Sequence, residues 1–185
     1  MSKRLAEDIA AFLSVNEVYR SLKRLPDEFL QRSRLLSGET VVQVALDLWG
    51  RGDQRNRWAA ATLLQSRPTA FRHLRWRPLE EMGDGMGNWG DADAFALLAG
   101  LAWRNGQISD QRVHRWARSQ NRWWRRAALV CTVVLNRGSV GGRGDVGRTL
   151  AVAELLASDR DDMVVKGLSW RHESSVRFET SLRLD

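Results

Sequence analysis

Apolar residues at helical spacing run through nearly the whole chain, and this pattern restricts the fold more than any other feature of the sequence. Val41, Val44, Ala45 and Leu48, for example, stand at i, i+3, i+4 and i+7, which places their side chains on one face of an α-helix. No segment shows the sustained apolar–polar alternation of a half-buried strand. The sequence therefore predicts an all-α protein. The helical spacing recurs at residues 5–13, 58–64, 95–102, 127–135, 150–157 and 163–168.

The breaks between these segments are short. Pro26 and Pro68 stand near the start of a helix, where proline is tolerated because the first N–H groups have no helical partner. Helices of roughly 10 to 15 residues joined by short turns are typical of an α-solenoid, an α-α superhelix of HEAT-like antiparallel helix pairs. A globular helix bundle is the alternative. We expect one helical-repeat domain over residues 1–170, followed by an atypical C-terminal tail at residues 171–185.

The chain is basic, and arginine carries almost all of its positive charge. It holds 29 Lys plus Arg against 22 Asp plus Glu, a formal net charge of +7, and only Lys3, Lys23 and Lys166 are lysines. A basic surface binds polyanions because phosphate neutralisation releases counterions, and guanidinium groups both fit phosphate and stack on aromatic rings. The charge therefore favours a nucleic-acid-binding protein, although an arginine-biased codon usage would give the same composition without such a role.

Several classes of protein are disfavoured by features that the sequence lacks. Cys131 is the one cysteine, so neither an intrachain disulfide nor a cysteine-based metal cluster is expected, and the three histidines lack ligand spacing. The glycines of residues 138–144 do not follow a predicted strand, which argues against a dinucleotide-binding or P-loop motif. We see neither a signal-peptide pattern nor an apolar run of membrane-spanning length. We therefore expect a soluble, cytoplasmic monomer with no metal, no cofactor and no membrane contact.

Tryptophan is abundant and often stands beside arginine. The chain has nine tryptophans but one tyrosine, and residues 122–126 place Trp123 and Trp124 between arginines. Aromatic rings interleaved with arginine bind nucleic acids through stacking, cation–π and phosphate contacts. The same pairs also form cation–π contacts inside a stack of helices, and the sequence leaves both interpretations open.

Two charged residues stand on otherwise apolar helix faces. Asp93 lies one turn after Trp89, and a buried carboxylate costs free energy unless it has a partner or a chemical role. The alternative is that Asp93, or Asp91 before it, caps the start of the helix. Arg126 shares a face with Trp123, where it would pair with a carboxylate, reach a phosphate or serve only the packing.

The order of three stretches resembles the DNA alkylation repair (AlkD-type) family, from about residue 40 to residue 170. That family carries a Trp and an Asp four residues apart, here Trp89 and Asp93. It then carries a pattern W-A-x-S-x-N-x-W-x-x-R-A-A, matched by residues 116–128, whose functional arginine is Arg126 here. A final helix with a valine, a lysine and a functional tryptophan matches residues 162–170.

The resemblance implies a HEAT-like α-solenoid whose basic concave surface holds duplex DNA that contains alkylated bases. It implies an N-glycosylase that hydrolyses the glycosidic bond of cationic N3- or N7-alkylated purines. Asp93 would then oppose positive charge on the sugar, and Trp89 and Trp170 would face the cationic nucleotide. Arg126 would hold a phosphate near the lesion. Further expected DNA contacts, which would bring the protein to the nucleoid, are Arg122, Arg125 and Lys166.

The residues after Trp170 depart from the family pattern, because they are polar, few and poorly periodic. Helical repeats need polar capping elements at their ends, so we expect this departure to weaken stability and activity. The main alternative function is a non-catalytic helical-repeat scaffold that binds DNA or another protein. An RNA-binding helical repeat would use the same Arg and Trp surface, but the sequence shows no periodic base-reading pairs.

Overall fold

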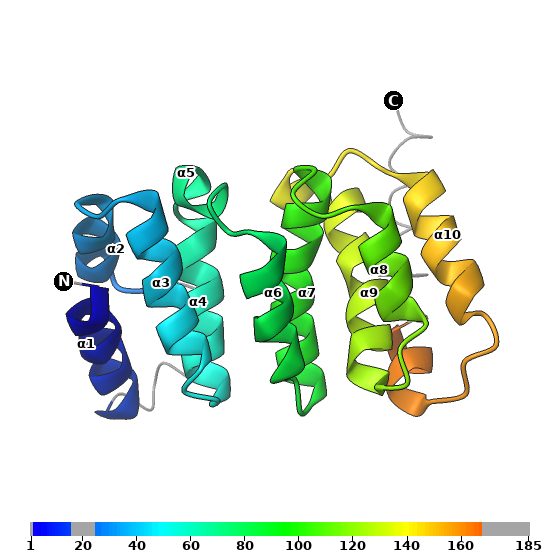
Figure 1. Cartoon of the computed structure of the whole chain (residues 1–185), viewed down its shortest axis with the longest axis horizontal. Helices are drawn as coiled ribbons and strands as arrows, with labels where there is room; N and C mark the ends of the chain where they lie inside the picture. The colour runs from blue at the N-terminus through cyan, green and yellow to red at the C-terminus, as the bar shows by residue number, and fades with distance from the viewer. Residues whose placement is uncertain (1, 16–24, 168–185) are drawn as a thin grey trace. The chain divides into compact units, whose positions relative to one another are not determined.

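The computed structural model describes residues 2–15 and 25–167. Within these two ranges all regular elements are helices and no strand is present, which confirms the all-α prediction (Figure 1). No helix in the described ranges is long and apolar enough to cross a membrane. The elements are α1 (Ser2–Val15), α2 (Asp27–Arg34), α3 (Gly38–Trp49), α4 (Gln54–Gln65), α5 (Pro68–Phe71), α6 (Trp76–Asp84), α7 (Trp89–Arg104), α8 (Asp110–Ala117), α9 (Arg122–Asn136), the 3-10 turn η2 (Gly138–Val140), α10 (Val146–Leu156) and a further helical stretch at residues 162–167.

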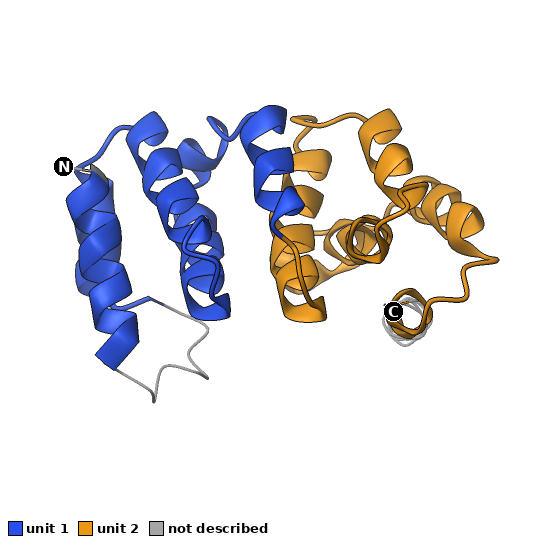
Figure 2. Cartoon of the chain, turned by 60° about the horizontal axis from the view of Figure 1, so that its bottom comes forward, with its two compact units in different colours: residues 1–85 blue, residues 86–185 orange. Residues whose placement is uncertain are grey.

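The chain divides into two compact units, residues 1–85 and residues 86–185 (Figure 2). In unit 1, helix α3 packs against α1 and α4, and its Leu48 is fully buried. The Trp49 indole N–H donates to the carbonyl oxygen of Met82 at 2.8 Å, and the Arg57 guanidinium lies 5.6 Å from the Trp49 ring. Arg57 also donates to the carbonyl oxygen of Gly85 at 2.7 Å. One tryptophan–arginine pair of unit 1 thus holds helices together, as the packing alternative predicted.

In unit 2 the helices alternate in direction, and every second helix runs parallel. Helices α7 and α9 are parallel, because Asp93 contacts Arg126 while Gly100, further along α7, lies against Val134, further along α9. The stretch at residues 162–167 also runs parallel to α9, since Met163 contacts Arg126 and Gly167 lies near Leu129. Helices α8 and α10, which follow α7 and α9 in the chain, run in the opposite direction, because the start of α8 at Asp110 contacts Trp103 near the end of α7 and Thr149 near the start of α10 contacts Asn136 at the end of α9.

Gly100 allows α7 and α9 to approach closely. A Cβ atom at this position would lie 2.7 Å from the carbonyl oxygen of Cys131 and 2.8 Å from the Cβ of Val134. These distances are shorter than van der Waals contact, so only glycine fits at this crossing. The α7–α9 packing is the most extensive helix–helix contact in the described part of the chain.

An edge-to-face cluster of aromatic rings fills the core of unit 2. The Phe95 ring lies 5.5 Å from the Trp116 ring and 5.2 Å from the Trp124 ring, both in T-shaped geometry, which aromatic pairs favour. Trp103, fully buried, donates its indole N–H to Asp110 at 2.7 Å. Several tryptophans of this unit therefore serve packing.

The direction reversals in unit 2 are the local pattern of stacked antiparallel helix pairs. The α-solenoid and the single domain over residues 1–170 stay predictions, as does the tail at residues 171–185, which lies outside the described residues.

Candidate active site

The Asn88 and Asp91 side chains form the N-terminal cap of α7, and Asp93 takes no part in it. The Asn88 side-chain oxygen accepts from the backbone N–H of Asp91 at 3.1 Å. The buried Asp91 carboxylate in turn accepts from the Gly87 N–H at 3.1 Å and from the Asn88 amide at 2.9 Å. This reciprocal arrangement satisfies N–H groups that a helix start leaves without helical partners. The N-cap of α7 is thus Asn88, and the expectation that Asp91 or Asp93 caps the helix was wrong: Asp91 supports the Asn88 side chain, and Asp93 takes no part.

Asp93 lies one turn further into α7 and binds Arg126 of α9 with both carboxylate oxygens. The Arg126 Nε–H donates to Oδ1 at 2.9 Å and an Nη2–H donates to Oδ2 at 3.0 Å. The Asp93 side chain is 17% exposed and the Arg126 side chain 10% exposed. Paired ions in this fork-to-fork geometry are strong and orientationally fixed, because two parallel charge-assisted hydrogen bonds hold them. Asp93 is therefore an oriented carboxylate that solvent still reaches.

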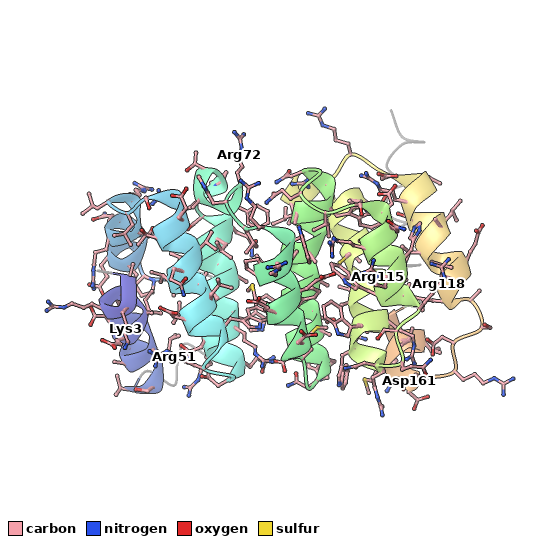
Figure 3. All side chains as sticks on the ribbon, in the orientation of Figure 1. Lys3, Arg51, Arg72, Arg115, Arg118 and Asp161 are labelled. Carbon is pink, nitrogen blue, oxygen red and sulfur yellow. The ribbon has the colours of Figure 1, made fainter. Side chains whose placement is uncertain are left out.

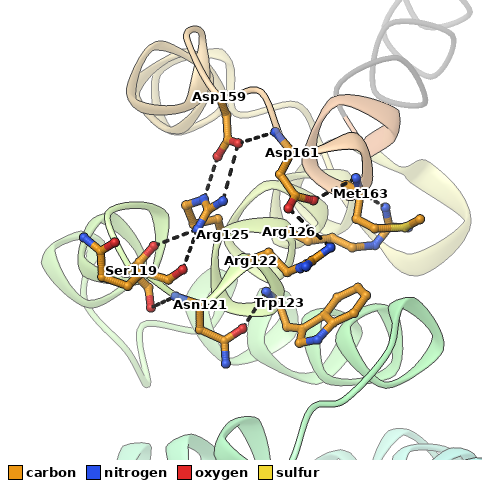
Figure 4. A network of polar contacts seen from close by, with 10 residues as sticks. Ser119, Asn121, Arg122, Trp123, Arg125, Arg126, Asp159, Asp161 and Met163 are labelled. Carbon is orange, nitrogen blue, oxygen red and sulfur yellow. Dashed lines mark hydrogen bonds and ion pairs between the residues drawn. The ribbon is translucent and has the colours of Figure 1, made fainter.

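The third contact of Arg126 comes from the stretch at residues 162–167. An Nη1–H donates to the backbone carbonyl oxygen of Met163 at 2.6 Å (Figure 4). The Arg126 guanidinium therefore joins three parallel helices, since Asp93 lies 33 residues before it in the chain and Met163 lies 37 residues after it. A guanidinium carries five N–H groups. Within the described part of the chain, two of those on Arg126 have no partner, so the side chain has donors left for a ligand.

Aromatic rings stand one turn before each member of the pair. Trp89 precedes Asp93 on α7 and is 57% exposed, which is unusual for so large an apolar side chain. Trp123 precedes Arg126 on α9, and the Arg122 guanidinium lies 5.7 Å from its ring centroid. The sequence placed Trp123 on the same helix face as Arg126 but gave it no role of its own. Trp170, the third residue predicted to be catalytic, lies outside the described residues.

The other predicted DNA contacts differ in their surroundings. Arg122 is 54% exposed, with Nη1 at 3.4 Å from an oxygen of Asp161. Lys166 is exposed, one turn after Met163. Arg125 is only 19% exposed and forms an ion pair with Asp159 at 2.6 Å. Burial alone would raise the pKa of the Asp159 carboxyl, but hydrogen bonds from Arg125 and from the backbone N–H of Asp161 outweigh it and lower that pKa.

Sequence reasoning missed the partners that the third stretch supplies. The Met163 carbonyl belongs to the backbone, so no residue type signals it. Asp159 and Asp161 stand just before the final family stretch and were assigned no role from the sequence, because their arginine partners lie more than 30 residues earlier in the chain. In the described ranges, no group of three or more His, Cys, Asp or Glu side chains is arranged to hold a metal ion.

A comparison with protein families identifies the family to which a chain with this Asp93–Arg126 pair belongs. The profile described as "DNA alkylation repair enzyme" matches residues 10–171, most of the chain. The chain belongs to the DNA alkylation repair enzyme family. The matched range includes Asp93 and Arg126 together with the third stretch, so the site lies inside the region that defines membership of the DNA alkylation repair family. Neither a curated protein nor a solved structure gave a significant match.

Proposed function

We propose that this protein is a DNA N-glycosylase that hydrolyses the glycosidic bond of cationic N3- or N7-alkylated purines in duplex DNA. The main support is the Asp93 carboxylate, which is oriented by Arg126 and partly exposed. The family match supports DNA as the substrate. We also propose that the helices form a HEAT-like α-solenoid, for which the alternating directions in unit 2 are the support.

The reaction needs little acid catalysis, because an alkylated purine is already a cation. When the bond between C1′ and the purine nitrogen breaks, its electron pair passes to the ring and the base leaves neutral. Positive charge then develops on the deoxyribose, and a fixed carboxylate stabilises that charge most when water is largely excluded. Asp93 would oppose this charge and accept a proton from the water whose oxygen bonds to C1′. The products are the free base and an abasic site.

Arg126 would orient Asp93 and hold a DNA phosphate with its two remaining N–H groups. Arginine suits both tasks because its planar fork binds carboxylate and phosphate bidentately. The pair lies near the starts of α7 and α9, where partial positive charge on backbone N–H groups favours anions. We propose Arg122 and Lys166, both exposed, as further phosphate contacts. Phosphate contacts fix register without reading sequence.

Trp89 and Trp170 would present electron-rich ring faces to the cationic nucleotide. A ring attracts a cation through its quadrupole, and the attraction grows when the cation is desolvated. The exposure of Trp89 supports this role, because packing does not account for a tryptophan more than half exposed beside an oriented carboxylate.

Asp93→Asn tests the chemistry directly. The change keeps the shape and a hydrogen-bond acceptor but removes the charge, so release of base from methylated duplex DNA should fall by about two orders of magnitude or more. DNA affinity should be retained or rise, because a negative charge is lost. Asp91→Asn is the matched control: it makes the same change in the same helix at a carboxylate that does not contact Arg126, so excision should stay close to the wild-type rate.

Excision by Asp93→Asn at the wild-type rate would remove Asp93 from the mechanism. If the wild-type protein binds DNA without releasing bases, the non-catalytic scaffold is the better description.

Salt dependence tests the mode of DNA binding. Exposed cationic side chains project from both units, with Arg51 and Arg72 in unit 1 and Arg115 and Arg118 in unit 2 (Figure 3). Phosphate contacts release counterions, so the logarithm of the association constant should fall linearly with the logarithm of salt concentration, by about 0.9 per contact. Equal affinity for unrelated duplexes is expected at each salt concentration. Affinity that ignores salt would contradict phosphate-dominated binding.

A further inference from the structure

Arg125 has almost no donor capacity left for DNA. Its Nε–H donates to Asp159 Oδ2 at 2.6 Å and an Nη2–H donates to Oδ1 at 3.5 Å. Its Nη1 donates to the carbonyl oxygens of Ser119 at 3.0 Å and Gln120 at 2.9 Å. Four of the five N–H groups of a guanidinium are thus engaged. The Asp159 side chain is 9% exposed, so the positive charge of Arg125 is compensated inside the protein.

A short segment, residues 159–163, connects Arg125 to Arg126 by hydrogen bonds. Asp159 Oδ1 accepts from the backbone N–H of Asp161 at 2.9 Å, and Asp161 Oδ1 accepts from the N–H of Met163 at 3.0 Å. Figure 4 shows these contacts side by side with the loop between α8 and α9. Met163 then accepts from Arg126 through its own carbonyl oxygen. The Arg125–Asp159 pair therefore fixes residues 159–163, and this segment fixes one edge of the Arg126 guanidinium.

We infer that Arg125 is a positioning residue, which acts through Asp159 and Met163 to hold Arg126 against Asp93. This inference rests on the proposed glycosylase function only for the expected loss of activity. It gives adjacent arginines of α9 different tasks, because Arg125 binds protein groups while Arg126 keeps donors for a phosphate. Lysine would not replace Arg125, since an ammonium group does not span a carboxylate and two carbonyl oxygens in a planar fork.

Asp159→Asn distinguishes two roles of Arg125, positioning Arg126 or binding a phosphate, because the two roles predict opposite effects on excision. If Arg125 bound phosphate, the variant would release it from a competing carboxylate and remove a negative charge, so DNA binding and excision would be unchanged or stronger. If Arg125 positions Arg126, the variant should lower excision, as should Arg125→Lys, which retains the charge. We expect a loss of about tenfold or more for each, the scale of a small misplacement of reacting groups.

The matched control is Arg148→Lys. Arg148 forms an ion pair with Asp110 at 2.8 Å and stacks on Trp103 in the same unit, away from the segment at residues 159–163. Its change should lower stability while excision remains within about twofold of wild type. If Arg148→Lys lowers excision as much as Arg125→Lys does at matched stability, Arg125 has only a general structural role.

A double-mutant cycle with Arg126→Ala gives the decisive measurement on activity. If Arg125 acts through Arg126, Arg125→Lys should change single-turnover excision by less than about twofold in the Arg126→Ala background. A full additional loss there would overturn the inference, because it would show that Arg125 acts independently.

A readout that does not need activity keeps this inference distinct from the proposed function. In nitrogen-15 NMR spectra of the full chain, the Nε–H of Arg126 should exchange slowly with water, because it donates to Asp93. Asp159→Asn should accelerate that exchange, because exchange reports local opening of the Arg126 contacts. Unchanged exchange would overturn the inference even if excision is found. Faster exchange in a protein that releases no base would retain the positioning role and reject the glycosylase.

Discussion

Gly100→Ala should destabilise unit 2, although alanine usually favours a helix. The substitution adds one methyl group at the crossing of α7 and α9. That methyl would lie 2.7 Å from the Cys131 carbonyl oxygen and 2.8 Å from both Cβ and Cγ2 of Val134. A backbone oxygen inside a helix has little freedom to move, and the β-branched Val134 has few rotamers to choose from. The two helices would therefore have to separate locally.

Two effects of opposite sign set the magnitude. Alanine is favoured over glycine in a helix interior by about 0.5–1 kcal/mol. Overpacking a well-packed core costs typically about 1–3 kcal/mol. Because the contact is with backbone, we expect the upper part of that range and a net loss of about 1–2 kcal/mol. For a chain of this length each kcal/mol lowers Tm by about 2–4 °C, so Tm should fall by about 2–8 °C.

The assay is thermal and urea unfolding of Gly100→Ala beside a matched glycine. Gly147 lies in α10 with open space around its Cβ position, so Gly147→Ala should leave Tm unchanged or raise it slightly. Excision should fall with Gly100→Ala because the Asp93–Arg126 pair joins the same two helices. A Gly100→Ala protein as stable as Gly147→Ala would refute the close approach of α7 and α9.

Three further predictions concern single side chains. Trp89→Ala should reduce excision by about tenfold or more with little change in Tm, because its exposed ring contributes little to the core but would face the substrate. The pKa of Asp159 is lowered in the folded protein, so this carboxylate stabilises the fold above its unfolded pKa of about 3.9. That contribution to the free energy of unfolding is lost as pH falls through the folded pKa. In urea unfolding between pH 6 and pH 3, the free energy of unfolding should therefore decline less steeply for Asp159→Asn than for the wild type. Burial raises the pKa of the Cys131 thiol, so a thiol reagent at pH 8 should label it only at the rate of unfolding, and fast labelling of the native protein would contradict its burial.

The helices that the sequence predicted best are those with a long apolar face. The pattern at residues 95–102 falls inside α7, and that at residues 127–135 falls inside α9. Helix α8 was not predicted, because its eight residues bury only Val113, Trp116 and Ala117, too few to establish a period. Elements of this length depend on their neighbours more than on their own pattern.

The candidate site was predictable as residues but not as an arrangement. The sequence indicated Asp93 as a carboxylate on one apolar helix face and Arg126 as a cation on another. Because 33 residues separate them in the chain, the ion pair between them could not be predicted. Such a contact depends on which helices lie side by side, and local spacing carries no such information. The cap at Asn88 was within reach of the sequence, because Asn is a favoured N-cap residue and Asp91 follows it at the spacing of a capping box.

The parallel arrangement in unit 2 has an evolutionary consequence. Asp93, Arg126 and Met163 stand on successive parallel helices, and the partners of this group in the described residues all come from unit 2. Gain or loss of a helix pair between Asp93 and Met163 would change which helices lie side by side in unit 2 and separate one group from the others. A change of the same size before residue 86 would leave these intervals intact. Length variation among relatives should therefore concentrate in the first unit, while the second keeps its number of helices.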